Sequence, residues 1–105
     1  MSAILVLCTC PDSACAERIA AALVEERLVA CVNRISGIES TYRWQGKVCH
    51  DSEQLLLIKT TRQRFDALRD RIVALHPNQV PEVVAVDIML GLERYLDWIK
   101  RETEA

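Results

Sequence analysis

The chain lacks any apolar run near the ~20 residues that a membrane-spanning helix needs, although 50% of its 105 residues are hydrophobic. It has only 3 glycines, 3 prolines and no internal repeat, which excludes a collagen-like or disordered chain. No basic residue precedes the apolar stretch 3–7, so we expect no secretory signal and a cytoplasmic location. A net charge of −2 argues against nucleic-acid binding. The composition predicts one globular domain over residues 1–105, with no nucleic-acid or membrane partner.

The sequence patterns of common enzyme classes are missing too. The chain has no Ser/His/Asp order, no HExxH motif and no phosphate-binding glycine loop. Glu53, Lys59 and Glu82 have acid–base side chains and could act at a cleft between subunits, but none is paired with a plausible nucleophile. We therefore expect no enzymatic activity and no catalytic residue.

Cysteine, in contrast, is abundant: five residues, an odd number, in a chain without an export signal. This usage favours free thiols over a disulfide framework. Cys8 and Cys10 lie two apart on a predicted strand and face the same side. Cys15 lies in the first turn of the next helix, where the helix N-terminus favours thiolate. Three sulfurs at one strand-to-helix junction indicate a soft-metal site, and core packing is the alternative for each. We expect Cys31 to lie in the core, because its neighbours are apolar.

Histidine occurs twice. His76 precedes Pro77 at the predicted end of a helix, where a neutral imidazole could bind a metal ion. The alternative is a protonated His76 that stabilises the helix C-terminus. His50 lies in a polar stretch near a predicted hairpin, and we expect it to be solvated.

Hydrophobic periodicity predicts alternating elements along the whole chain. Strands are predicted at 3–9, at 29–35 and 38–44 with a bend or bulge at Ser36-Gly37 between them, at 47–59 and at 83–89. Helices are predicted at 13–27, after Thr60 or Thr61 up to Pro77, and at 92–102. This βαββαβ order with an extra C-terminal helix predicts an α+β, ferredoxin-like sandwich, with two helices on one face of a four-stranded sheet.

The hairpin between the second and third strands is too long for a compact monomer. A continuous strand over 29–45 would span roughly 55 Å, whereas the first helix is only roughly 24 Å long. The hairpin therefore projects and exposes Tyr42, Trp44 and Val48. Burial against another copy of the chain would cover them, so we expect an oligomer.

Seven motifs in order, from about residue 4 to residue 99, resemble the CutA family of divalent-cation tolerance proteins. They are Cys8-Thr9-Cys10-Pro11-Asp12, Leu28-Val29-Ala30-Cys31-Val32-Asn33, Tyr42-Arg43-Trp44-Gln45-Gly46, Ile58-Lys59-Thr60, His76-Pro77, Val80-Pro81-Glu82 and Tyr95-Leu96-Asp97-Trp98-Ile99.

The resemblance implies a cytoplasmic homotrimer whose hairpins pack between neighbours and which serves tolerance of copper and other divalent metals. It also implies signalling at clefts between subunits, as in the PII proteins. By resemblance, Cys8 and His76 are the metal contacts, and copper or another divalent ion is the bound metal. The alternative is a metal-independent trimeric scaffold or anchor for a partner protein.

The chain departs from the family pattern at several positions. Asn78 replaces an aromatic residue after His-Pro, which would make the ligand pocket more open or more polar. Ser36 and Asp87 stand where relatives usually have proline. Cys10 and Cys15 are extra thiols that could alter metal preference.

Overall fold

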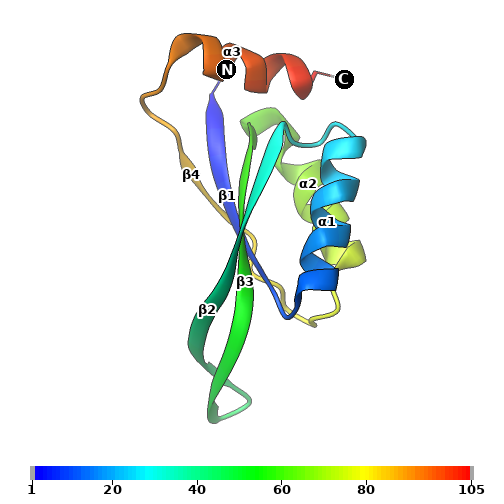
Figure 1. Ribbon diagram of the computed structural model, residues 1–105, viewed down its shortest axis with the longest axis vertical. Helices are drawn as coiled ribbons and strands as arrows, with labels where there is room; N and C mark the ends of the chain where they lie inside the picture. The colour runs from blue at the N-terminus through cyan, green and yellow to red at the C-terminus, as the bar shows by residue number, and fades with distance from the viewer. Residues whose placement is uncertain (1, 105) are drawn as a thin grey trace.

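The computed structural model describes residues 2–104 and contains the predicted elements in the predicted order (Figure 1). They are β1 (Ala3–Cys10), α1 (Ser13–Glu25), β2 (Cys31–Trp44), β3 (Lys47–Thr61), the 3₁₀ turn η1 (Arg62–Arg64), α2 (Phe65–Leu75), β4 (Val84–Asp87) and α3 (Glu93–Glu102). The sheet order is β2-β3-β1-β4, and every neighbouring pair is antiparallel. Helices α1 and α2 lie side by side on one face of the sheet, while α3 crosses one end (Figure 1). The prediction of a ferredoxin-like α+β fold is confirmed.

The hydrophobic core lies between the sheet and helices α1 and α2. Strand β1 alternates strictly between buried and half-buried residues, because successive side chains point to opposite faces. Its buried positions face the apolar stripes of the two helices. The buried cluster comprises Ile4, Val6, Cys8, Cys10, Cys15, Ala16, Ile19, Leu23, Val29, Leu56, Ile58, Leu68 and Ile72.

The first helix ends at Glu25, two residues before the predicted end. Arg27 adopts φ +60°, and its N–H donates to the Val24 carbonyl while the Leu28 N–H donates to Leu23. These two bonds form a Schellman ending, which glycine usually provides. The chain has arginine rather than glycine at this position, so the hydrophobic pattern overestimated the length of the helix.

The predicted threonine cap of the second helix is absent. Thr61 takes the position before η1 without a side-chain capping bond, and Thr60 instead donates its hydroxyl to the Leu28 carbonyl. Helix α2 itself begins only at Phe65.

The long hairpin of β2 and β3 projects beyond the helices (Figure 1). The prediction of roughly 55 Å for the second strand was too long, because the molecule's longest dimension is 44 Å. A bulge between Ile35 and Ile38, with Gly37 at φ +74°, takes up one residue and bends the strand. Gln45 and Gly46 both have positive φ and form the predicted turn.

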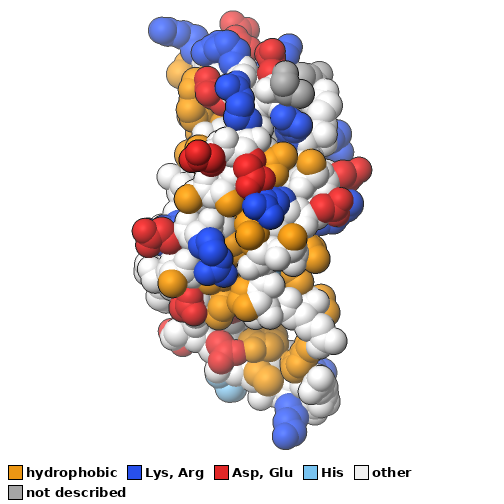
Figure 2. Space-filling model, turned by 90° about the vertical axis from the view of Figure 1, so that its right-hand side faces the viewer, with side chains coloured by type: hydrophobic (Ala, Val, Ile, Leu, Met, Phe, Trp, Pro, Cys, Tyr) orange, Lys and Arg blue, Asp and Glu red, His pale blue; other side chains and the backbone are white. Residues whose placement is uncertain are grey.

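The second face of the sheet carries apolar side chains that α1 and α2 do not cover. The strand registers place them on one surface: Leu5, Leu7, Ile35, Leu55, Leu57, Val84 and Val86. We call this surface the open sheet face. The helix-covered side, in contrast, mixes Lys and Arg with Asp and Glu (Figure 2).

The C-terminal part is less buried than predicted. Strand β4 covers only Val84–Asp87, and Met89 beyond it is 88% exposed. In α3, Ile99 is fully buried as expected, whereas Tyr95 is 40% exposed and stacks on Trp98. Among residues 2–104, no helix has the length and apolar character needed to cross a membrane.

Candidate metal centre

Strand β1 brings two thiols to the core side of the sheet at its C-terminal end. Cys8 and Cys10 face the same side, as their two-residue spacing predicts, and both are fully buried. His76 follows α2 and is 7% exposed. The two sulfur atoms and an imidazole nitrogen all lie within 4.8 Å of one another. The fold thus places the two predicted metal contacts, Cys8 and His76, together and adds Cys10 to them.

Cys15 lies beside this cluster in the first turn of α1. Asp12 caps the helix, and its Oδ1 accepts the Cys15 N–H at 2.8 Å. The thiol is 3% exposed and lies beside Cys10, and each of these two thiols affects the pKa of the other. Cys15 does not belong to the mutual 4.8 Å set.

Two of the thiols, Cys10 and Cys15, are held in their protonated form. A hydrogen bond with Cys8, together with burial, raises the pKa of Cys10 far above its usual range. Burial and then the neighbouring Cys10 raise the pKa of Cys15 to about 11. The helix N-terminus, expected to favour thiolate at Cys15, does not lower its pKa below the usual range, because burial raises that pKa.

Hydrogen bonds occupy both nitrogens of the His76 ring. Nε2 donates to the Thr9 carbonyl at 2.7 Å, and Nδ1 accepts the Asn78 N–H at 3.1 Å. Because Nδ1 accepts the Asn78 N–H, it carries no hydrogen of its own, and this geometry does not fit the protonated helix-end alternative. His76 therefore fastens the end of β1 to the turn after α2.

The donor set suits a soft or borderline metal ion. Thiolate and imidazole ligands bind copper and zinc, whereas calcium and magnesium need oxygen ligands. Gln54 lies opposite Cys10 in the strand register, and its Oε1 is buried without a hydrogen-bond partner among the described residues. Such an unpaired acceptor indicates that the polar bonding around the thiols is incomplete.

The remaining cysteines lie elsewhere. Cys31 is half-buried on the open sheet face next to Tyr95, so the prediction of a core position was wrong. Its register with Lys59, rather than its apolar neighbours in sequence, determines its face. Cys49 is half-buried in the projecting hairpin. His50 is exposed as predicted and hydrogen-bonds Thr41.

A hollow of about 570 Å³ lies between the projecting hairpin and the loop before β4. Glu53 and Glu82, two of the predicted acid–base candidates, both line it. Lys59 does not: it bonds to Asn33 on the open sheet face. The other lining residues are Thr9, Ser40, Thr41, Tyr42, Trp44, Asn78, Gln79 and Val80.

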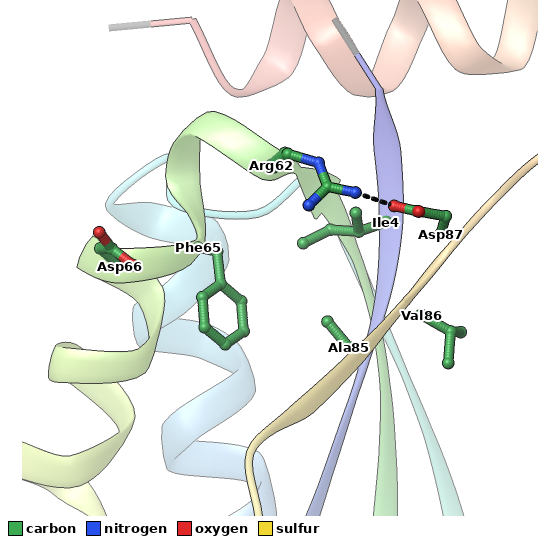
Figure 3. A pocket seen from close by; sticks show the side chains of 7 residues that line it. All are labelled: Ile4, Arg62, Phe65, Asp66, Ala85, Val86 and Asp87. Carbon is green, nitrogen blue, oxygen red and sulfur yellow. Dashed lines mark hydrogen bonds and ion pairs between the residues drawn. The ribbon is translucent and has the colours of Figure 1, made fainter.

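A second hollow, of about 630 Å³, separates α2 from the edge strand β4 (Figure 3). Arg62 reaches across its upper end to an ion pair with Asp87, and the Phe65 ring points into it (Figure 3). Local sequence patterns do not report this ion pair, because Arg62 and Asp87 are 25 positions apart in the chain.

Fold and cluster together define a ferredoxin-like protein with a buried thiol–imidazole centre. The family model described as CutA1 divalent ion tolerance protein matches residues 4–102. The divalent-cation tolerance protein CutA of Thermus thermophilus is 54% identical over 94% of this chain and 96% of its own length. The chloroplastic protein CutA of Arabidopsis thaliana is 44% identical over 95% of this chain, which spans 55% of that longer protein. A solved structure of the divalent cation tolerance protein from Thermus thermophilus superposes with a TM-score of 0.95 at 52% identity, covering 97% of this chain and 99% of that one. The chain belongs to the CutA1 family of divalent ion tolerance proteins.

Proposed function

We propose that the protein is a cytoplasmic homotrimer that responds to copper or another soft metal ion and signals at clefts between its subunits. The observation that carries this proposal is the cluster of Cys8, Cys10 and His76, whose donor atoms lie within 4.8 Å of one another. Its role is binding rather than catalysis. The five free cysteines of the chain suit a reducing compartment.

The trimer is supported by surfaces that a single chain leaves uncovered. The open sheet face is apolar, and Tyr42, Trp44 and Val48 on the projecting hairpin are 42%, 40% and 57% exposed. Exposed apolar surface of this kind marks an interface. Both edge strands, β2 and β4, also have one unpaired side in the described chain.

The cleft is supported by its connection with the cluster. Thr9 and Asn78 line the hollow at the hairpin, and the backbones of both residues bond to the His76 ring. A metal ion that shifts the ring would therefore move two residues of the hollow. A further subunit seated on Tyr42 and Trp44 would close the same hollow.

Metal uptake by reduced, untagged protein tests the proposal. Three samples of the protein are dialysed separately, one against Cu(I) in reducing buffer, one against Cu(II) and one against Zn(II). The bound metal is then measured by elemental analysis. We expect one ion per chain for at least one metal and its loss in Cys8→Ala, with Cys49→Ala as the matched control because its thiol lies outside the cluster. Absence of binding of all three ions, in protein that is folded, would contradict the proposal.

The alternative is a metal-independent trimeric scaffold for a partner protein. The observation that favours it is the full hydrogen bonding of His76, which gives the residue a structural role without metal. A partner that stays bound in the presence of a chelator and with Cys8→Ala would support the scaffold. A partner released by the chelator would support the metal response.

A further inference from the structure

We propose that Cys8 and Cys10 alone coordinate one soft monovalent cation, Cu(I) or Ag(I), as a two-thiolate pair, while His76 stays outside the coordination sphere. This inference rests on the proposed function and names the ion and the ligands of the same site. It differs from the sequence-based prediction in one ligand, because it replaces His76 with Cys10.

The geometry of β1 provides the pair. Residues two apart on one strand present their side chains side by side, and both sulfurs lie on the core side within 4.8 Å of each other. A thiolate bond to a d¹⁰ metal ion is about 2.3 Å long, so two such bonds in line span about 4.6 Å. The sulfurs are separated by no more than about this span, so one ion can bond to both of them.

The His76 imidazole can coordinate a metal ion only by giving up a hydrogen bond. Coordination through Nε2 would cost its bond to the Thr9 carbonyl, and coordination through Nδ1 would cost the bond from the Asn78 N–H. Either loss would leave a backbone polar group without its partner in a site that is 7% exposed at His76. A cation that accepts two ligands avoids this cost.

Coordination number then sets the selectivity. Zinc in closed protein sites takes four ligands, and the cluster offers three donor residues, one of them already hydrogen-bonded. Soft thiolates select Cu(I). The site thus has enough ligands for a monovalent ion such as Cu(I) and too few for zinc.

Cys15 completes the arrangement as a hydrogen-bond donor. Two thiolates and one monovalent cation carry a net charge of −1, and each thiol releases its proton to solvent when the ion binds. The Cys15 thiol lies beside Cys10 in the first turn of α1, where its S–H can donate to the Cys10 thiolate and stabilise this charge. Cys15 is therefore a positioning residue and not a ligand.

Competition between the protein and a Cu(I) chelator of known affinity tests the inference, together with X-ray absorption at the copper edge of the wild-type complex. We expect one Cu(I) per chain with sulfur neighbours only. Cys8→Ala and Cys10→Ala lose the ion, His76→Gln keeps wild-type stoichiometry and affinity, and Cys31→Ala is the unaffected control. Cys15→Ala weakens binding by ~10–100-fold, whereas Cys15→Ser, which keeps a donor, restores it.

Two results would overturn the inference and leave the proposed function standing. One is a nitrogen neighbour in the absorption spectrum of the wild-type complex, which requires no variant to fold. The other is one Zn(II) or Cu(II) per chain with no Cu(I). Absence of every metal would instead overturn the proposed function along with it.

Discussion

Replacing Trp44 by alanine should weaken the assembly of the protein more than its fold. Trp44 lies at the end of β2 in the projecting hairpin, 40% exposed in the single chain. A tryptophan side chain offers up to about 250 Å² for burial, so about 100 Å² is left for a neighbouring subunit to cover. At ~25 cal/mol per Å² this area is worth about 2.5 kcal/mol for each subunit, or ~60-fold in the association constant of one interface.

Sedimentation equilibrium over a range of concentrations measures this loss directly. We expect Trp44→Ala to dissociate at concentrations where the wild type stays assembled, with a thermal midpoint that depends on protein concentration. Val73→Ala is the control, because Val73 is 55% exposed on α2, on the helix-covered side. A mass distribution and thermal midpoint equal to those of the wild type would refute the reasoning and show that Trp44 faces solvent.

Three further predictions concern the site and its supports. Affinity for Cu(I) should rise by at least ~10-fold per pH unit and keep rising through pH 9, because the raised pKa of Cys10 keeps a proton in competition with the metal. Chelator competition at several pH values measures this dependence. A plateau of the affinity above pH 8 would contradict the prediction. Asp12→Ala should cost ~1 kcal/mol of unfolding free energy through loss of the cap of α1, measured by urea denaturation against Asp12→Asn, which keeps the acceptor. Gly37→Ala should lower the unfolding free energy by about 1–2 kcal/mol in the same assay. The cost comes from backbone strain alone, since no atom lies within 4 Å of the added Cβ. An unchanged midpoint would show that the bulge rearranges.

The sequence predicted the order of elements because the hydrophobic periods of this chain are clear. The alternation over β1 and the stripe of α2 are both seen in the burial of Val6, Cys8, Leu68 and Ile72. The ends of elements were less predictable. Helix α1 ends at an arginine-based turn, in which Arg27 takes a backbone conformation that only contacts in the folded chain maintain.

The candidate site was predictable only where local geometry determines it. The two-residue spacing places Cys8 and Cys10 on one face, and the structure confirms this. The bond from His76 to the Thr9 carbonyl joins residues 67 positions apart, and no local pattern reports it. The same holds for the burial of Cys15, whose effect on the thiol exceeds that of the helix N-terminus.

Native mass spectrometry of the intact assembly tests the account most directly. The spectrum is recorded after one equivalent of Cu(I) per chain has been added in reducing buffer. The account predicts a species of three 11.9 kDa chains, about 36 kDa, that carries three copper ions and loses them in Cys8→Ala. A metal-free species of 11.9 kDa would contradict both the trimer and the metal centre.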